Sequence, residues 1–180
     1  MDLAELRQRV AAGERFEYLL FWGHQPRKDG SIGPSCLSQW FPAPFDIDGV
    51  RYLTSEHWMM AGKAQLFGDE ETLAKILESP HPGAAKSLGR QVRGFDQAGW
   101  MAVARRIVTE GNIAKFRQNP TLREYLLGTG SQVIVEASPH DPVWGIGLAA
   151  DDPLAKHPAS WRGENLLGFA LMDARDVLHE

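Results

Sequence analysis

The segment between residues 54 and 127 constrains the fold most, because helix signals follow one another along almost its whole length. Capping residues, glycines and prolines divide it into expected helices at 54–67, 70–78, 83–92, 97–118 and 119–127. Further helices are expected at 2–13 and 164–178, and expected strands lie only outside the segment, at 16–22, 45–52 and 132–137. Helices therefore outnumber scattered strands, which predicts a predominantly helical α+β fold with a small β-sheet.

Length and cysteine content limit the class of protein. A chain of 180 residues is expected to form a single domain over residues 1–180, burying about 70% of its unfolded surface. Cys36 is the only cysteine, so no intrachain disulfide can form and a cytoplasmic location is expected. The N-terminus lacks the pattern of a secretory signal, and no apolar run approaches the ~20 residues of a membrane helix, so no membrane partner is expected.

Charge and motif content exclude several functions. The net charge of −4 argues against a basic nucleic-acid platform, although a locally basic cleft is compatible with it. The histidines and the single cysteine show no zinc-binding spacing, and the chain has no G-x-x-x-x-G-K-[ST], G-x-G-x-x-G or G-x-S-x-G motif. Neither a metal nor a cofactor is therefore predicted. Six tryptophans either belong to the core or form the walls of a flat ligand pocket.

The first candidate constellation lies in the expected helix that begins at Thr54 or Ser55. Glu56 and Lys63 are seven residues apart, so they share one helix face, with their Cα atoms ~10 Å apart along the axis. That spacing suits two groups that grip opposite ends of a small reacting group. The competing interpretation is that Glu56 only complements the helix dipole and Lys63 is a surface lysine.

The second constellation is the segment 136–147, which begins where Glu136 closes an otherwise apolar strand. A proline-flanked turn presents Asp141, and Trp144 and Gly145 follow. Glycines here allow backbone N–H groups to approach a ligand. The competing interpretation is that Asp141 makes an Asx turn, Trp144 belongs to the core and the glycines only form turns.

Two further constellations lie in expected helices. Asn112, Lys115 and Asn119 place three polar groups within about two turns of one helix. Asn165 precedes the last helix, where it either reads the edge of a base or caps the helix.

Taken in order, these segments resemble the blocks of the NADAR/YbiA-like family. The resemblance covers about residues 16 to 178 and rests on many ordered blocks at matching spacing. The blocks are Phe21-Trp22-Gly23, Ser38–Phe41, Tyr52–Met60 with Lys63-Ala64, Gly89-Arg90, Trp100, Gly111-Asn112, Lys115-Phe116, Glu136–Pro139, Asp141, Trp144–Gly147 and Asn165–Gly168.

The resemblance implies a single helix-rich α+β domain with N-glycosidase activity. One branch of the family is similar to enzymes that hydrolyse phosphoribosylamino-pyrimidine intermediates of riboflavin biosynthesis, releasing ribose 5-phosphate. Another branch removes ADP-ribose from guanine in nucleic acid, and a module that binds ADP-ribose or NAD-type nucleotides without catalysis is the alternative of a different class. The first substrate class is preferred, because a chain of net charge −4 suits a small phosphoribosyl or ADP-ribosyl molecule better than bulk nucleic acid. The oligomeric state is left open.

The resemblance also implies roles for individual residues. The expected catalytic groups are Glu56, Lys63 and Asp141. Ribose C1 on an exocyclic amine is either captured by Lys63 as an imine or attacked by water that Glu56 or Asp141 activates. Stacking on the base is expected from Trp100 and Trp144, and phosphate binding from Arg90 and Lys115. The full set of expected substrate-binding residues is Trp22, Gly23, Arg90, Trp100, Asn112, Lys115, Glu136, Trp144, Gly145 and Asn165.

Overall fold

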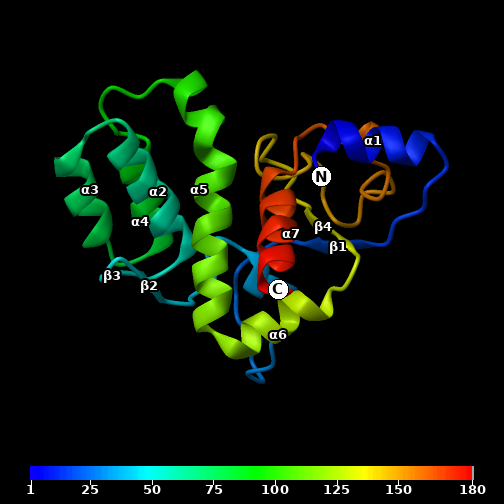
Figure 1. Cartoon of the computed structure of the whole chain (residues 1–180), viewed down its shortest axis with the longest axis horizontal. Coiled ribbons are helices and arrows are strands. Elements are labelled where there is room, and N and C mark those ends of the chain that lie inside the picture. Colours follow the sequence, from blue (N-terminus) through cyan, green and yellow to red (C-terminus); the bar gives the residue numbers. More distant parts are fainter. Residues whose placement is uncertain (180) are drawn as a thin grey trace.

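The long helix α5 (Gln97–Gln118) runs through the middle of the molecule (Figure 1). The computed structural model describes residues 1–179. On one side of α5 lie three consecutive helices, α2 (Ser55–Leu66), α3 (Glu70–Leu77) and α4 (Pro82–Gly89). On the other side lie α7 (Leu166–His179), α1 (Leu3–Ala11) and the strands β1 (Tyr18–Phe21) and β4 (Val133–Glu136), while α6 (Pro120–Gly128) follows α5 at its C-terminal end.

The strands form two separate two-stranded sheets. β1 pairs in parallel with β4, from Tyr18 opposite Val133 to Phe21 opposite Glu136. The helices α2 to α6 occupy the connection between these strands, as a parallel pair requires a long crossover. β2 (Phe45–Ile47) and β3 (Val50–Tyr52) form an antiparallel hairpin within the segment 45–52 that was expected to be extended. The predominantly helical α+β class is confirmed, and its strands form these two small sheets where the sequence predicted one.

Helix boundaries lie close to the expected ones because side-chain caps specify them. Asp2 accepts a hydrogen bond from the Glu5 N–H (2.8 Å) at the start of α1, and Asp96 accepts one from the Gly99 N–H (2.6 Å) at the start of α5. Two short 3₁₀ turns, η1 (Pro34–Leu37) and η2 (Pro158–Ser160), interrupt the long loops. The expected strand at 16–22 is shorter in the structure, because only the part that pairs with β4 is a strand.

Close contact between α2 and α5 explains why α5 keeps a glycine in its middle. A Cβ atom on Gly111 would overlap Cδ1 of Trp58, and one on Gly62 would lie 2.9 Å from Cγ2 of Ile107. The indole N–H of Trp58 donates to the carbonyl oxygen of Ile107 at 2.6 Å. Glycine destabilises the interior of a helix, and here the close packing of α2 on α5 offsets that cost.

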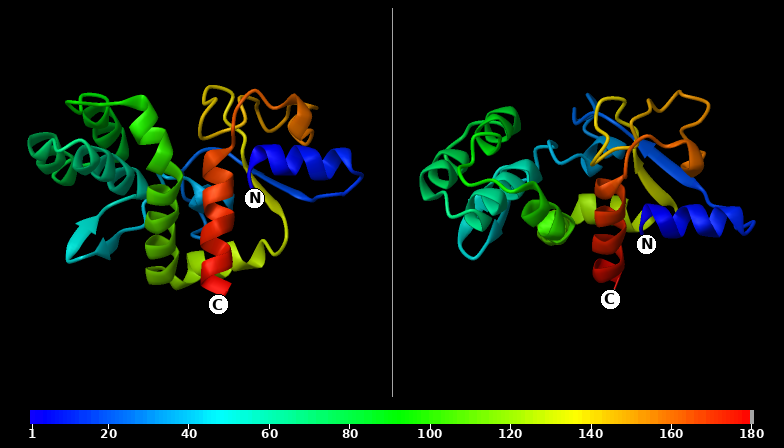
Figure 2. Two further views of the ribbon diagram at one scale, coloured as in Figure 1. Left: turned by 45° about the horizontal axis from the view of Figure 1, so that its top comes forward. Right: turned by 90° about the horizontal axis from the view of Figure 1, so that it is seen from above.

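On the side of α5 opposite α2, the strand β4 and the helix α7 lie side by side (Figure 2). Val133, Ile134 and Val135 are fully buried. A Cβ atom on Gly168 of α7 would overlap the carbonyl oxygen of Ile134, so the helix approaches the strand more closely than any other residue type would allow. This contact fixes the end of β4, where Glu136 lies.

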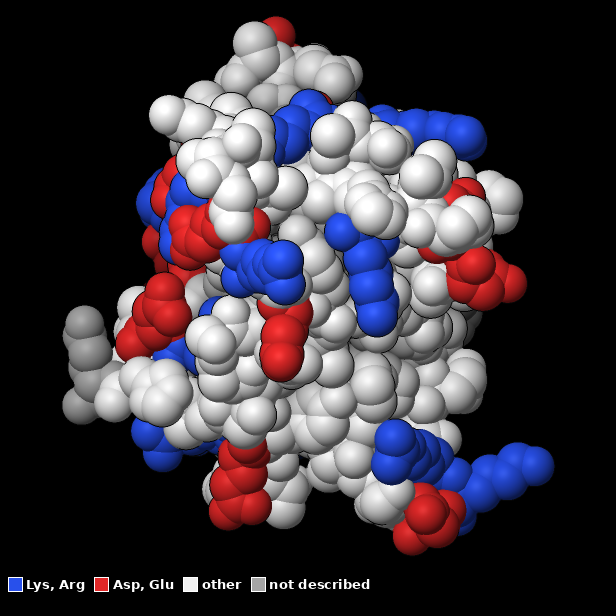
Figure 3. Space-filling view, turned by 90° about the vertical axis from the view of Figure 1, so that its right-hand side faces the viewer, with Lys and Arg blue, Asp and Glu red and all other residues white. Residues whose placement is uncertain are grey.

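The face on the α1 side carries Lys, Arg, Asp and Glu side chains interspersed (Figure 3). It shows no broad field of one sign of the kind that steers polyanions. Within residues 1–179, no helix has both the length and the apolar character needed to span a bilayer.

Candidate active site

A cavity of about 310 Å³ is lined by residues of α2, α4, the start of α5 and the loop after β4. Its wall carries three carboxyl groups, from Glu56, Glu136 and Asp141. It also carries three cationic groups, from Lys63, Lys86 and Arg90. The structure thus brings the constellations at 54–64 and 136–147, which lie far apart in the sequence, to one cavity.

Glu56 enters the cavity from the first turn of α2, which Thr54 caps. Its backbone N–H donates to the carbonyl oxygen of Gln39 (3.0 Å), which ties this turn to the segment 38–41. The residue is 2% exposed, and its Oε1 atom has no hydrogen-bond partner among residues 1–179. Burial raises the pKa of the carboxyl to about 7, against the opposing effect of the nearby Lys86 ammonium. Such a group is poised to exchange a proton with a ligand.

Glu136 enters from the opposite wall, at the end of β4. Its backbone N–H donates to Oδ1 of Asn165 (3.0 Å), and its carbonyl oxygen accepts from the Ile146 N–H (2.9 Å). Oε2 is buried and, within the described residues, has no hydrogen-bond partner. Burial and the neighbouring carboxyl groups of Asp141 and Glu56 raise the pKa of Glu136 to about 8. Glu56 and Glu136 therefore each place one buried, unpaired carboxyl oxygen at the same cavity.

Asp141 both makes an Asx turn and lines the cavity. Its Oδ1 atom accepts hydrogen bonds from the backbone N–H groups of Val143 (2.9 Å) and Trp144 (2.8 Å), which is an Asx turn. The same residue lines the cavity and raises the pKa of both Glu56 and Glu136. The turn thus positions a carboxylate at the cavity wall.

Lys63 lies two turns after Glu56 on α2, as the spacing predicts, and faces the cavity. Its Nζ atom lies 4.0 Å from the centre of the Phe95 ring. Partial burial and the charge of Arg90 lower the pKa of its ammonium group. A lowered pKa increases the fraction of Lys63 that is neutral and able to act as a nucleophile.

Lys86 is a cavity residue that the sequence analysis missed. It lies four residues before Arg90, at the end of α4, and both side chains face the cavity. The Lys86 charge acts on both Glu56 and Glu136. The signal in the sequence was the i, i+4 spacing of two cations on one short helix, which places them on the same face.

Aromatic side chains complete the wall. Trp100 and Trp144, both expected there, line the cavity, and so do Phe95 and Trp40, which were not proposed. The Lys86 Nζ atom lies 5.7 Å from the centre of the Trp40 ring. Flat aromatic walls next to charged groups suit a ligand that joins a heterocycle to an anionic sugar.

Asn112 and Lys115 do not line the cavity. The Lys115 Nζ atom is fully buried and donates to the carbonyl oxygens of Cys36 (2.7 Å) and Ser38 (3.0 Å). Asn112 donates to Oε1 of Gln39 (2.9 Å). Both side chains point into the protein, where they hold the segment that contributes Ser38, Gln39 and Trp40 to the wall. The phosphate-binding role expected of Lys115 therefore does not fit its position.

Gly145 and Asn165 also lie behind the wall rather than on it. Asn165 has a positive φ of 53°, and its side chain bridges the Ile134 carbonyl oxygen and the Glu136 N–H. A Cβ atom on Gly145 would lie 2.9 Å from the Glu136 carbonyl oxygen. Both residues thus fix the backbone that carries Glu136.

Trp22 and Gly23 are not among the cavity-lining residues. Trp22 is 61% exposed, directly after β1, and Gly23 has a positive φ of 83°. Their expected contact with substrate remains a prediction. Among residues 1–179, no three His, Cys, Asp or Glu side chains are grouped as metal ligands.

The chain matches a protein family and is similar to proteins named N-glycosidases. Residues 20–179 match the NADAR domain. The chain is 43% identical over 168 residues to N-glycosidase R617 of Acanthamoeba polyphaga mimivirus, covering 91% of this chain and 97% of that protein. It is 31% identical over 135 residues to N-glycosidase YbiA of Escherichia coli K12, covering 75% of this chain and 76% of that protein.

A solved structure shares the fold. The NMR structure of the E. coli protein YbiA matches with a TM-score of 0.71 at 26% identity, covering 92% of this chain and 87% of that one. The matched residues 20–179 include both walls of the cavity, with Glu56 on one and Glu136 on the other.

Proposed function

The chain belongs to the NADAR domain family and is an N-glycosidase, and we propose that it hydrolyses the bond between ribose C1 and the exocyclic amine of a phosphoribosylamino-pyrimidine. The products are ribose 5-phosphate and the free amine. Its substrate is thus a small glycosylated molecule of the class that riboflavin biosynthesis uses.

The proposal rests on the cavity having both acidic groups, which can transfer protons, and cationic groups, which can bind an anion. Glu56, Glu136 and Asp141 provide groups that exchange or accept protons, and Lys86 and Arg90 provide charge for an anion. Lysine and arginine bind phosphate through charge-assisted hydrogen bonds. The volume of about 310 Å³ lies at the small end of the usual range for ligand sites, roughly 300–1,000 Å³. A mononucleotide-sized substrate suits such a space.

Lys63 supports capture of the sugar as an imine. A sugar carried on an exocyclic amine opens to an imine at C1, and a neutral lysine amine adds to that carbon and displaces the base. Water then releases the aldehyde of the sugar and regenerates Lys63. Burial and Arg90 lower the pKa of Lys63, which favours its neutral form. Glu56 is the base that activates the water.

The test is a side-by-side turnover assay. Wild-type protein and Glu56→Gln are given a phosphoribosylamino-pyrimidine and, separately, DNA carrying ADP-ribose on guanine, and the released sugar is quantified. The proposal predicts release of ribose 5-phosphate by wild-type protein and its loss in the variant. Turnover of the DNA alone would replace the substrate with ADP-ribosylated guanine. Binding of nucleotides without turnover of either substrate would identify a sensor instead.

The role of Lys63 has its own readout. Borohydride added during turnover reduces an imine to a stable amine, so the sugar becomes covalently attached to the protein. We expect attachment in wild-type protein and none in Lys63→Met. Full turnover by Lys63→Met would exclude the imine route.

A further inference from the structure

From the cavity geometry we infer that Glu136 is the general acid of the reaction and gives its proton to the exocyclic amine as the C–N bond breaks. This inference rests on the proposed function and assigns a chemical role to one carboxyl group of that same cavity.

The position of Glu136 is unusually well fixed. Three independent contacts hold its backbone, from the Asn165 side chain, from the Ile146 N–H and from the pairing of β4 with β1. Gly145 packs so closely that no side chain fits between it and the Glu136 carbonyl oxygen. A proton donor has to lie within hydrogen-bond reach of the atom that it protonates, so a rigid backbone favours this role.

One oxygen of the side chain, in contrast, is left without a partner. Oε2 of Glu136 is buried and accepts or donates no hydrogen bond within residues 1–179. Buried polar atoms in native proteins are rarely unpaired, because an unpaired one costs free energy. Glu136 lines the cavity, so the missing partner is expected to be an atom of the ligand.

The charges that face Glu136 favour its protonated form. Asp141, from the following loop, and Glu56, from α2, are both acidic, and Lys86, from α4, is the opposing cation. Together with burial these groups raise its pKa to about 8, so the carboxyl carries a proton at neutral pH. A carboxyl group kept neutral by its surroundings is able to donate a hydrogen bond and then the proton.

The two other carboxyl groups are less suited to the role of acid. Asp141 uses Oδ1 for two backbone N–H groups. For Glu56, the Lys86 ammonium is the largest influence that favours ionisation, whereas for Glu136 it is outweighed by two neighbouring carboxyl groups. The arrangement therefore separates a base, Glu56, from an acid, Glu136.

The proton balance closes over one cycle. As the bond between C1 and the exocyclic nitrogen breaks, its electron pair stays on nitrogen, which takes the proton of Glu136 and leaves as a neutral amine. Glu136 is then a carboxylate. Water supplies the oxygen that ends on C1. Glu56 takes one proton of that water and passes it on to Glu136, so both carboxyl groups return to their starting state. This balance holds whether the first nucleophile at C1 is Lys63 or water.

The experiment varies the leaving amine. Two 5-phosphoribosyl arylamines are used, one of 4-methoxyaniline, a poor leaving group, and one of 4-nitroaniline, which leaves without much help from an acid. For Glu136→Gln we expect kcat/KM on the methoxy substrate to fall by on the order of 10²–10⁴-fold, the usual size of a general-acid contribution, and by about tenfold or less on the nitro substrate. Spontaneous hydrolysis is subtracted from both rates.

Glu56→Gln is the matched control, since it removes a second buried carboxyl from the same cavity without removing the acid. Because Glu56 acts on the water step, Glu56→Gln should lower kcat on both substrates, without the dependence on the leaving amine that Glu136→Gln shows in kcat/KM. Equal losses on both substrates in Glu136→Gln, or no loss, would overturn the assignment of Glu136 while leaving N-glycosidase function intact. Failure of wild-type protein to cleave either arylamine or the pyrimidine substrate would instead remove the proposed function.

Glu136→Met is made in parallel, so that a folding failure in one variant leaves the comparison to the other. Thermal unfolding of each variant is measured before the assays. Failure of both variants to fold would also overturn the proposal, because it would show that the carboxyl group serves the structure.

Discussion

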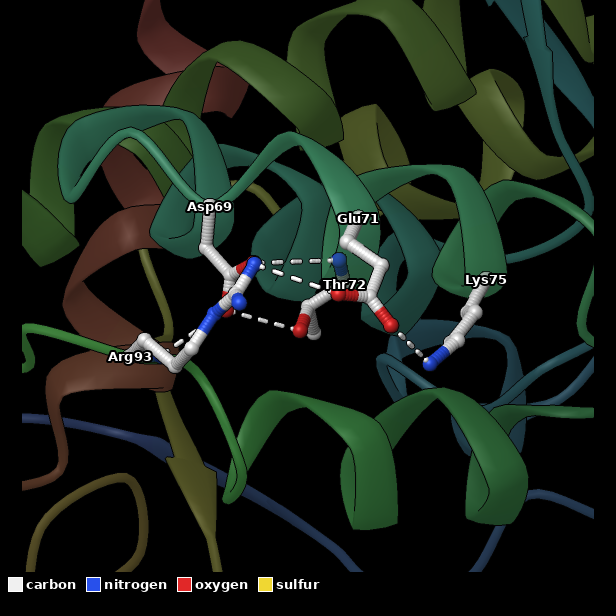
Figure 4. Close-up of polar contacts among 5 residues, drawn as sticks. All are labelled: Asp69, Glu71, Thr72, Lys75 and Arg93. Atoms are coloured by element: carbon white, nitrogen blue, oxygen red, sulfur yellow. Dashed lines mark hydrogen bonds and ion pairs between the residues drawn. The ribbon is translucent and has the colours of Figure 1, made fainter.

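Two buried acidic sites in this protein have opposite surroundings. Asp69, at the start of α3, is 2% exposed and accepts hydrogen bonds from the backbone N–H groups of Thr72 (3.2 Å) and Arg93 (2.8 Å), from the Thr72 hydroxyl (2.7 Å) and from the Arg93 guanidinium (2.6 Å) (Figure 4). These donors hold the pKa of Asp69 well below its usual range. Glu56 and Glu136 have free oxygens and raised pKa values.

The difference in hydrogen bonding distinguishes a carboxyl group that stabilises the fold from carboxyl groups that are available to a ligand. Asp69 is a structural anchor, since it ties α3 to the loop 90–96 that carries Phe95 to the cavity. Its hydrogen-bonding capacity is used within the fold. Glu56 and Glu136 keep unused capacity on a cavity, at a cost in stability that a bound ligand can offset.

The largest expected effect is on catalysis. Glu56→Gln should lower kcat by on the order of 10²–10⁴-fold, because the amide cannot act as a base. The same variant should unfold at the wild-type temperature or higher, since it removes a buried ionisable group. Steady-state kinetics and thermal unfolding, run on one preparation, check both parts. A lowered melting temperature with unchanged kcat would make Glu56 a structural residue.

Asp69→Asn should give the reverse pattern. The amide cannot accept all the hydrogen bonds that the carboxylate accepts, and Arg93 loses its ion pair. We expect the melting temperature to fall by roughly 5 °C, with turnover per folded molecule reduced by less than about tenfold.

The pKa of Asp69 is lowered by folding, so its stabilisation is present above the ordinary carboxyl pKa and is lost as pH falls. The difference from wild type should therefore shrink in acid. Loss of turnover without loss of stability would place Asp69 in the reaction.

The pH dependence of stability should separate the two sites further. Folding raises the pKa values of Glu56 and Glu136, to about 7 and about 8. The folded protein therefore binds more protons than the unfolded chain between the ordinary carboxyl pKa and those values, and its stability falls as pH rises through that window. Each group contributes a slope of up to about 1.4 kcal/mol per pH unit. Denaturant unfolding of the Glu56→Gln/Glu136→Gln double variant should show a flatter pH profile than wild type. An unchanged profile would show that other groups control it.

The smallest expected effect concerns substrate affinity. Lys86→Gln should raise KM for the phosphorylated substrate by about tenfold with a smaller change in kcat, because it removes one charge from the phosphate contact. The matched control is Lys75→Gln, which removes a lysine that pairs with Glu71 on the exposed surface of α3 (2.7 Å). Equal KM values for Lys86→Gln and wild type would remove Lys86 from phosphate binding.

Local sequence patterns predicted part of this arrangement and missed the rest for a physical reason. Helix spacing places Glu56 and Lys63 on one face, and a strand end followed by a proline turn presents Glu136 and Asp141. No local pattern shows that Lys115 points inward to backbone carbonyls while Lys86 faces the cavity. Those directions depend on which helices pack together, and that packing is set by contacts between distant segments.

The same limit applies to the supporting residues. Asn112 and Asn165 stood out as candidates to contact substrate. Asn112 instead donates to the side chain of the cavity residue Gln39, and Asn165 holds the backbone of Glu136. Asparagine serves equally well as a ligand contact and as a bridge between backbone groups, and the chain around it does not distinguish the two uses.

The most direct test of the account is turnover per folded molecule, measured for Asp69→Asn and Glu56→Gln on a phosphoribosylamino-pyrimidine near pH 7. We predict that the rate falls by less than about tenfold in Asp69→Asn and by on the order of 10²–10⁴-fold in Glu56→Gln. Wild-type turnover by Glu56→Gln would contradict the claim that the unpartnered carboxyl groups of the cavity perform the chemistry.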